Sequence, residues 1–184
     1  GERLRTGRGR TASSNRWLSR QINDPYVKKA KAEGFRSRAA YKLIELDEKF
    51  GLLKGVTRAL DLGIAPGGWS QVVRQRCPKA AVVGIDLLPT DPIEGVTIFQ
   101  MDFMADEAPP ALQEALDGAP DLIMSDMAAN TVGHKQTDHL RTMGLVETAV
   151  DFAIATLAPG GTFIAKVLAG GTDTQLLALL KRHF

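Results

Sequence analysis

Acidic side chains stand at the ends of three successive apolar runs. Asp86 ends the run VVGID, Asp102 follows FQM, and Asp126 follows IMS. A carboxylate at the end of a strand can accept hydrogen bonds from ribose hydroxyls, and it attracts a cation. If the three runs are neighbouring strands, these carboxylates form a site for a nucleoside ligand that carries positive charge.

A glycine-rich turn precedes the first of these acids. The segment ALDLGIAPGGWSQ (59–71) passes from a small apolar run into three glycines and a proline. Glycine permits positive φ angles and lets the backbone approach a ligand closely, so Gly63 is a predicted backbone contact. The order Gly63-x-Ala65-x-x-Gly68 is close to the dinucleotide fingerprint.

Two features of this turn favour S-adenosylmethionine over a dinucleotide. Pro66 has no N–H to donate to a pyrophosphate, and surrounding carboxylates would repel one. S-adenosylmethionine instead carries a positive sulfur, an ammonium group and a ribose diol, which suit acidic strand ends. An NAD-dependent oxidoreductase on a similar fold remains the alternative.

Lys166 lies inside the apolar run TFIAKVL (162–168). Strand alternation places it on the face of Ile164 and Leu168, at the carboxyl edge, where it would face Asp126 from the neighbouring strand. An uncharged lysine there could accept the proton of a hydroxyl that attacks a methyl group. The alternative is a lysine near a strand end whose amine reaches water.

The residues after the fourth apolar run bear on the acceptor atom. Enzymes that methylate amino groups of bases commonly carry Asn/Asp-Pro-Pro-aromatic there, and the aromatic ring stacks on the base. Residues 125–130 read SDMAAN, with no proline and no aromatic residue. This segment therefore favours an oxygen acceptor over an amine.

The elements that must position these residues alternate along the chain. Strands are predicted at 58–62, 81–85, 96–101, 121–124 and 162–168, and helices at 37–50, 68–77, 110–117, 137–157 and 173–183. Ser37 is the predicted cap of the first helix and Gly51 its stop. The alternation predicts an α/β fold with a mostly parallel sheet covered by helices on both faces, and ligands bind at the carboxyl ends of such strands.

Charge is distributed unevenly. Residues 1–42 contain 12 Lys and Arg against three acids, whereas residues 43–184 contain 11 against 18. This asymmetry predicts a polyanionic partner for the N-terminal region. Residues 1–12 are predicted to be a basic, flexible tail and residues 13–184 a single domain, with 13–42 as its basic region.

Composition excludes several other classes of protein. A chain of 184 residues suits one domain. The single cysteine, Cys77, excludes an intramolecular disulfide and predicts a reducing, cytoplasmic location. No apolar run approaches the roughly 20 residues that span a membrane. His134 and His139 are poorly spaced as shared ligands on a helix, so no metal is predicted. We expect a monomer.

Taken together, these motifs resemble the FtsJ family of ribose 2′-O-methyltransferases. The resemblance extends from about Ser13 to the end of the chain and is carried by SSNRWLSRQINDPYVKKAKAEGFRSRAAYKL, DLGIAPGGWSQ, GIDLLPTDPIEGV, QMDF, SDMAAN and GGTFIAKV. It implies a Rossmann-like fold, S-adenosylmethionine as methyl donor, and a uridine 2′-hydroxyl in the A-loop of 23S rRNA as acceptor. The partner would be the large (50S) ribosomal subunit.

The resemblance also implies roles for individual residues. The catalytic residues would be Lys42, Asp126 and Lys166. The cofactor would contact Gly63, Gly67, Trp69, Asp86, Asp102 and Asp126. RNA phosphates would contact Arg16, Arg20, Lys28, Arg36 and Arg38.

One member of the family's catalytic set has no counterpart here. The missing residue is a glutamate, which in the family follows the last helix. This glutamate and two further strands of a seven-stranded sheet would lie beyond His183 and Phe184, so we expect a domain truncated at its C-terminus. A non-catalytic RNA-binding or ribosome-assembly factor with the same fold is the second alternative.

Overall fold

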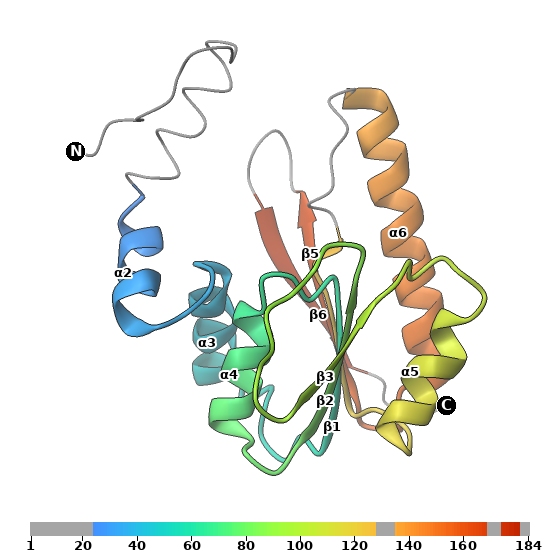
Figure 1. Cartoon of the computed structure of the whole chain (residues 1–184), viewed down its shortest axis with the longest axis horizontal. Helices are drawn as coiled ribbons and strands as arrows, with labels where there is room; N and C mark the ends of the chain where they lie inside the picture. The colour runs from blue at the N-terminus through green and yellow to red at the C-terminus, as the bar shows by residue number, and fades with distance from the viewer. Residues whose placement is uncertain (1–23, 128–134, 169–173, 181–184) are drawn as a thin grey trace.

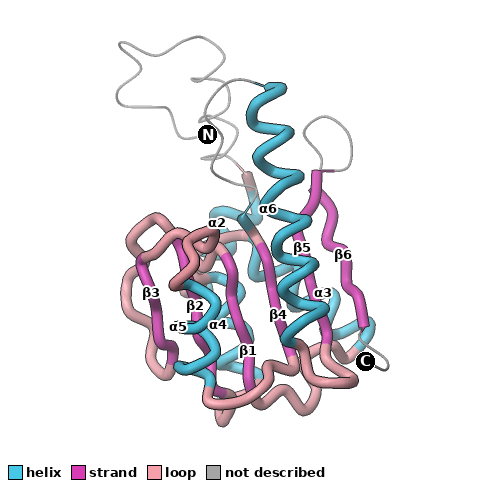
Figure 2. The backbone as a smooth tube through the Cα atoms, turned by 90° about the vertical axis from the view of Figure 1, so that its right-hand side faces the viewer, coloured by secondary structure: helices cyan, strands magenta, loops and turns pink. Residues whose placement is uncertain are grey.

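The computed structural model describes residues 24–127, 135–168 and 174–180, which form one six-stranded sheet flanked by helices (Figure 1). The strand order is β3-β2-β1-β4-β5-β6 (Figure 2). The strands are β1 Arg58–Leu62, β2 Ala81–Asp86, β3 Val96–Gln100, β4 Leu122–Ser125, β5 Thr162–Leu168 and β6 Thr174–Leu180. The first five are parallel, and β6 is antiparallel to β5. The order reverses between β1 and β4, which is where such sheets open a ligand crevice.

Helices cover both faces of this sheet, as the alternation of elements predicts. They are α2 Pro25–Glu33, α3 Ala39–Phe50, α4 Gly68–Arg76, α5 Ala108–Leu116 and α6 Lys135–Thr156. Helices α3 and α4 lie on one face, and α5 and α6 lie on the other (Figures 1 and 2). The predicted α/β fold with a mostly parallel sheet is confirmed.

Two hydrophobic clusters, one on each face, hold the layers together. Leu60 and Leu62 of β1 pack with α5 and α6, whereas Ala59 packs with α3 and α4. Because side chains alternate along a strand, Asp61 points toward α3 and α4. Ile164 of β5 packs in that same second cluster. The alternation then turns Lys166 toward this face too, as predicted.

The last element differs from its prediction. A helix is predicted at 173–183, but residues Thr174–Leu180 form β6, and Leu176 pairs opposite Lys166 of β5. Residues 176–180 (LLALL) are continuously apolar, so their periodicity does not distinguish a buried helix from a strand. Pairing with the open edge of β5 supplies the hydrogen bonds, and the sheet has six strands where five were predicted.

The start of α3 is a smaller correction. Ser37 is the predicted cap, but Arg38 occupies the N-cap position and makes no side-chain cap bond. The Ala40 N–H donates to the backbone carbonyl of Ser37 at 3.3 Å. The predicted stop at Gly51 is confirmed, because Gly51 has a φ of 64° and donates to the Asp47 carbonyl at 2.7 Å. The remaining predicted boundaries agree within two residues.

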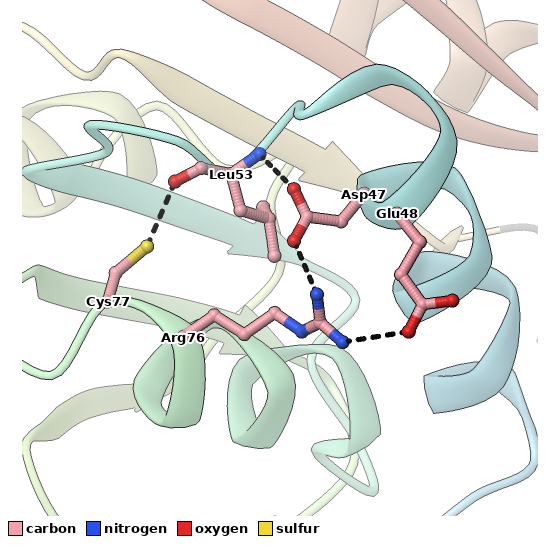
Figure 3. A network of polar contacts seen from close by, with 5 residues as sticks. All are labelled: Asp47, Glu48, Leu53, Arg76 and Cys77. Carbon is pink, nitrogen blue, oxygen red and sulfur yellow. Dashed lines mark hydrogen bonds and ion pairs between the residues drawn. The ribbon is translucent and has the colours of Figure 1, made fainter.

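The ends of α3 and α4 are tied by a polar network (Figure 3). Arg76 contacts Asp47 at 2.8 Å and Glu48 at 3.5 Å. Asp47 also accepts the Leu53 N–H at 2.8 Å, and the Cys77 thiol donates to the Leu53 carbonyl at 3.0 Å. This network lies away from the carboxyl edge of the sheet, so it fixes the scaffold without entering the site.

Ile64 and Gly84 fit together behind the glycine-rich turn. Ile64 is 3% exposed, and a Cβ built on Gly84 would lie 2.3 Å from its Cδ1 atom. The N–H groups of Gly63 and Ile64 both donate to the Ile85 carbonyl, at 2.8 and 3.1 Å. The turn is therefore anchored on β2, and the missing side chain of Gly84 leaves the space that Ile64 fills.

Candidate active site

The carboxyl edge of the sheet holds a cavity that brings four predicted cofactor residues together. Gly63, Asp86, Asp102 and Asp126 line it. The rest of its wall is largely apolar and includes Leu87, Leu88, Met101, Phe103, Met127 and Leu145. Carboxylates beside apolar side chains suit a nucleoside, because the hydroxyls meet acceptors while the base meets hydrocarbon.

A second, smaller cavity adjoins the first. It also includes Gly63 and Asp126, and it extends toward Asp61 and Trp69 on the α3 side. Trp69 is 4% exposed, and its indole N–H donates to the Ala39 carbonyl at 3.0 Å. Its ring therefore packs in the hydrophobic core and also forms part of the cavity wall. Gly67, the other predicted contact in this turn, lines neither cavity.

Asp86 connects the glycine-rich turn to the end of β2. Its Oδ2 accepts the Ala65 N–H at 2.9 Å, and its Oδ1 accepts the Leu88 N–H at 3.0 Å. Asp102 accepts the Met104 N–H at 2.9 Å. A carboxylate oxygen has two lone-pair sites, so both side chains keep acceptor capacity for a ligand while the backbone holds their orientation.

Lys166 and Asp126 form the ion pair that the sequence predicts. The Lys166 Nζ lies 3.8 Å from Asp126 Oδ1, and the two side chains are 29% and 21% exposed. Asp126 Oδ1 is buried and accepts no hydrogen bond from the described residues. Burial raises the pKa of Asp126, Lys166 opposes this rise, and Asp86 adds to it. The site thus contains a buried acceptor that a ligand donor could satisfy.

Lys42 is the third predicted catalytic residue. It lies exposed on α3, the helix on the face toward which Lys166 points, and it lines neither cavity. Its membership of the catalytic set stays a prediction.

Asp61 is a site residue that the sequence analysis missed. It is 1% exposed and lines the smaller cavity. Its Oδ2 accepts a hydrogen bond from the Ser70 hydroxyl, with 2.6 Å between the two oxygens. Burial raises its pKa to about 7, Ser70 opposes the rise, and the charges of Asp126 and Asp86 add to it. The signal that identified Lys166, a charged residue inside an apolar strand, applies equally to Asp61.

The predicted RNA contacts fall into three groups. Arg16 and Arg20 lie outside the described residues. Lys28 is exposed on α2, and Arg38 forms an ion pair with Asp24 while its guanidinium lies 5.5 Å from the Tyr26 ring. Arg36 instead donates to backbone carbonyls of the glycine-rich turn and of the segment after β2.

The described part of the chain contains neither a membrane-spanning helix nor a cluster of metal-ligating side chains. Within residues 24–127, 135–168 and 174–180, no helix has the length and apolar character needed to cross a membrane. Among the side chains that the structure describes, no group of three or more His, Cys, Asp or Glu residues is arranged to hold a metal ion.

The fold and the cavity define a class of protein. An open sheet with its cavity at the carboxyl ends of the strands, lined by carboxylates, is the arrangement of a Rossmann-like methyltransferase. Residues 35–184 match the FtsJ-like methyltransferases, and the chain belongs to this family.

Individual relatives agree with this assignment. The chain is 81% identical to a Novosphingobium aromaticivorans protein named ribosomal RNA large subunit methyltransferase E, over 100% of this chain and 82% of that one. An Erythrobacter litoralis protein of the same name is 76% identical, with 100% and 84% covered. A crystal structure of a Plasmodium falciparum ribosomal RNA methyltransferase superposes with a TM-score of 0.65 at 38% identity, covering 74% of this chain and 80% of that one.

Replacing Gly63 with alanine should destabilise the fold at the site. Gly63 has a φ of 81°, and its new Cβ would lie 2.8 Å from the Asp126 carbonyl oxygen. The left-handed backbone alone costs about 1–2 kcal/mol, and displacement of Asp126 adds to it. Urea unfolding measures the loss. Gly55→Ala is the matched control, because Gly55 has a φ of 75° and open space around it. Equal losses in the two variants would contradict a close contact at Gly63.

Proposed function

We propose that the chain transfers a methyl group from S-adenosylmethionine to the ribose 2′-hydroxyl of a uridine in the A-loop of 23S rRNA, within the large (50S) ribosomal subunit. The observation that carries this proposal is the Lys166–Asp126 pair beside the carboxylate-lined cavity, at 3.8 Å. The names of the relatives support ribosomal RNA as the substrate.

The residues of the two cavities fit this cofactor. Asp86 and Asp102 would accept the ribose hydroxyls, and the apolar wall with Leu87 and Phe103 would hold the base. Asp126 Oδ1 is buried and accepts no hydrogen bond from the described residues, which suits the positively charged end of the ligand. When bound, S-adenosylmethionine supplies a methyl group that its sulfonium already activates.

The chain itself contributes proton transfer and positioning. Lys166 in its uncharged form accepts the proton of the attacking 2′-hydroxyl at Nζ. Asp126 orients that amine and stabilises the ammonium that results, because its Oδ1 lies 3.8 Å from Nζ. Lys42 would add positive potential that favours the developing oxyanion. None of these steps needs a metal ion.

Binding of RNA should weaken steeply as salt is added. Lys28 and Arg38 would each neutralise one phosphate, so replacing either with alanine should reduce the slope of log K against log salt by about one. Filter binding of an A-loop RNA across a salt series measures this slope. Lys79→Ala is the control, because Lys79 is exposed and precedes the amino end of β2, away from the carboxyl ends that form the site. A shallow wild-type slope would count against this RNA surface.

The direct test is transfer of a radiolabelled methyl group to large ribosomal subunits that lack the modification. The full-length Novosphingobium aromaticivorans relative serves as the positive control. Label on a 23S ribose 2′-oxygen supports the proposal. Binding to subunits without label favours the assembly-factor alternative, and specific binding of NAD in place of S-adenosylmethionine would favour the oxidoreductase.

A further inference from the structure

Arg36 joins three segments that are distant in sequence. It lies in the turn between α2 and α3, and its Nη1 donates to the Asp91 carbonyl at 2.6 Å and to the Pro66 carbonyl at 3.3 Å. Its Nη2 donates to the Pro92 carbonyl at 2.7 Å. One guanidinium thus connects the glycine-rich turn with residues 87–95, the segment that follows β2.

The turn that carries Arg36 is itself fixed on α4. The Arg36 N–H donates to the Gln71 side-chain oxygen at 2.8 Å, and the Gln71 amide nitrogen donates to the Gly34 carbonyl at 3.1 Å. These bonds hold both sides of the turn against a helix that packs directly on the sheet. The guanidinium therefore extends from a rigid support.

The segment after β2 forms part of the main cavity wall. Leu87 and Leu88 line the cavity, and the Leu88 N–H donates to Asp86. Close packing at Gly67 fixes the distance between this segment and the glycine-rich turn. A Cβ on Gly67 would lie 2.6 Å from the Ile93 side chain and 3.5 Å from the Arg36 side chain. The absence of a side chain at Gly67 lets the two segments meet.

The geometry points to Arg36 as a positioning residue for the cofactor, acting through the segment after β2, and not as a phosphate contact. It holds that segment against the glycine-rich turn and so keeps Asp86 and Leu88 in place. The planar guanidinium suits this role, because its two terminal nitrogens reach three carbonyls from fixed positions, whereas a lysine has one ammonium nitrogen on a flexible chain. The inference deepens the proposed function and depends on its cofactor.

The test compares Arg36→Ala and Arg36→Lys with the wild-type chain. Calorimetry should show S-adenosylmethionine binding weakened about tenfold or more in both variants, and KM for the cofactor should rise while kcat at saturation stays unchanged. The salt slope of RNA binding should equal the wild-type slope. Hydrogen exchange should speed up locally at the amides of Ala65 and Leu88, which donate to Asp86.

Arg76→Ala is the matched control. Arg76 also ties two segments together, but it links α3 to α4 at the network of Figure 3 and does not touch either cavity. It should leave cofactor affinity and exchange at Ala65 and Leu88 unchanged. Wild-type affinity and exchange in Arg36→Ala, or a salt slope lowered by about one, would overturn the inference. A wild-type chain that binds no S-adenosylmethionine, but whose Arg36→Ala variant shows the faster local exchange, would support the positioning role and count against the proposed cofactor.

Discussion

Replacing Lys166 with alanine is expected to lower methyl transfer by about 10²- to 10⁴-fold, the contribution of a positioned general base. The variant removes the amine that lies 3.8 Å from Asp126 and that accepts the hydroxyl proton in the proposed function. Cofactor binding should stay close to the wild-type value, because the cavity residues Gly63, Asp86 and Asp102 are unchanged. Single-turnover transfer at saturating cofactor, together with calorimetry, measures the two quantities.

Lys166→Met provides a second variant of similar length without an amine, so loss of activity in both variants separates chemistry from packing. Lys54→Ala is the matched control, since Lys54 is exposed and precedes the amino end of β1, away from the carboxyl ends that form the site. Transfer at the wild-type rate by Lys166→Ala would show that Lys166 is not the base.

Asp61→Asn is expected to change the pH dependence of stability more than any other single substitution at the site. The pKa of Asp61 is raised in the folded chain from 3.8 to about 7, chiefly by burial. Between these values the unfolded chain loses the proton while the folded chain keeps it, so wild-type stability falls as pH rises. Asparagine is neutral at every pH and can still accept a hydrogen bond from the Ser70 hydroxyl. The stability of Asp61→Asn should therefore not fall with pH in this way.

The free energy of unfolding of Asp61→Asn relative to the wild type should therefore increase from about pH 4 to about pH 7 and then level off. A pKa difference of about three units corresponds to a gain of up to about 4 kcal/mol. Urea titrations at pH 4 and pH 8 measure the change. Asp106→Asn is an exposed control, expected to show no such trend. An equal difference between wild type and Asp61→Asn at both pH values would contradict a protonated, buried Asp61.

The architecture of the sheet was predictable because its signals are local. Short apolar runs predict the five parallel strands, and the rule that ligands bind at carboxyl ends predicts that Asp86, Asp102 and Asp126 meet at one end of the sheet. Alternation within β5 also placed Lys166 beside Asp126. In each case residues within one run, or at the ends of adjacent runs, carried the information.

The predictions that failed or stayed incomplete depend on contacts between distant segments. The predicted helix at 173–183 is β6, because pairing with β5 outweighs an ambiguous apolar pattern. Basic charge gave no indication that Arg36 contacts backbone carbonyls 30 and more positions away. Asp61 was overlooked although its position in an apolar strand was visible, since its partner Ser70 lies on a following helix.

Because Ile64 and Gly84 pack directly against each other, the residues tolerated at these two positions depend on one another. The side chain at 64 occupies the volume that a Cβ at 84 would need, so the space between the two residues holds only one side chain. A larger residue at 84 becomes tolerable only after 64 has become small. The effect of a substitution at 84 on stability therefore depends on which residue stands at 64.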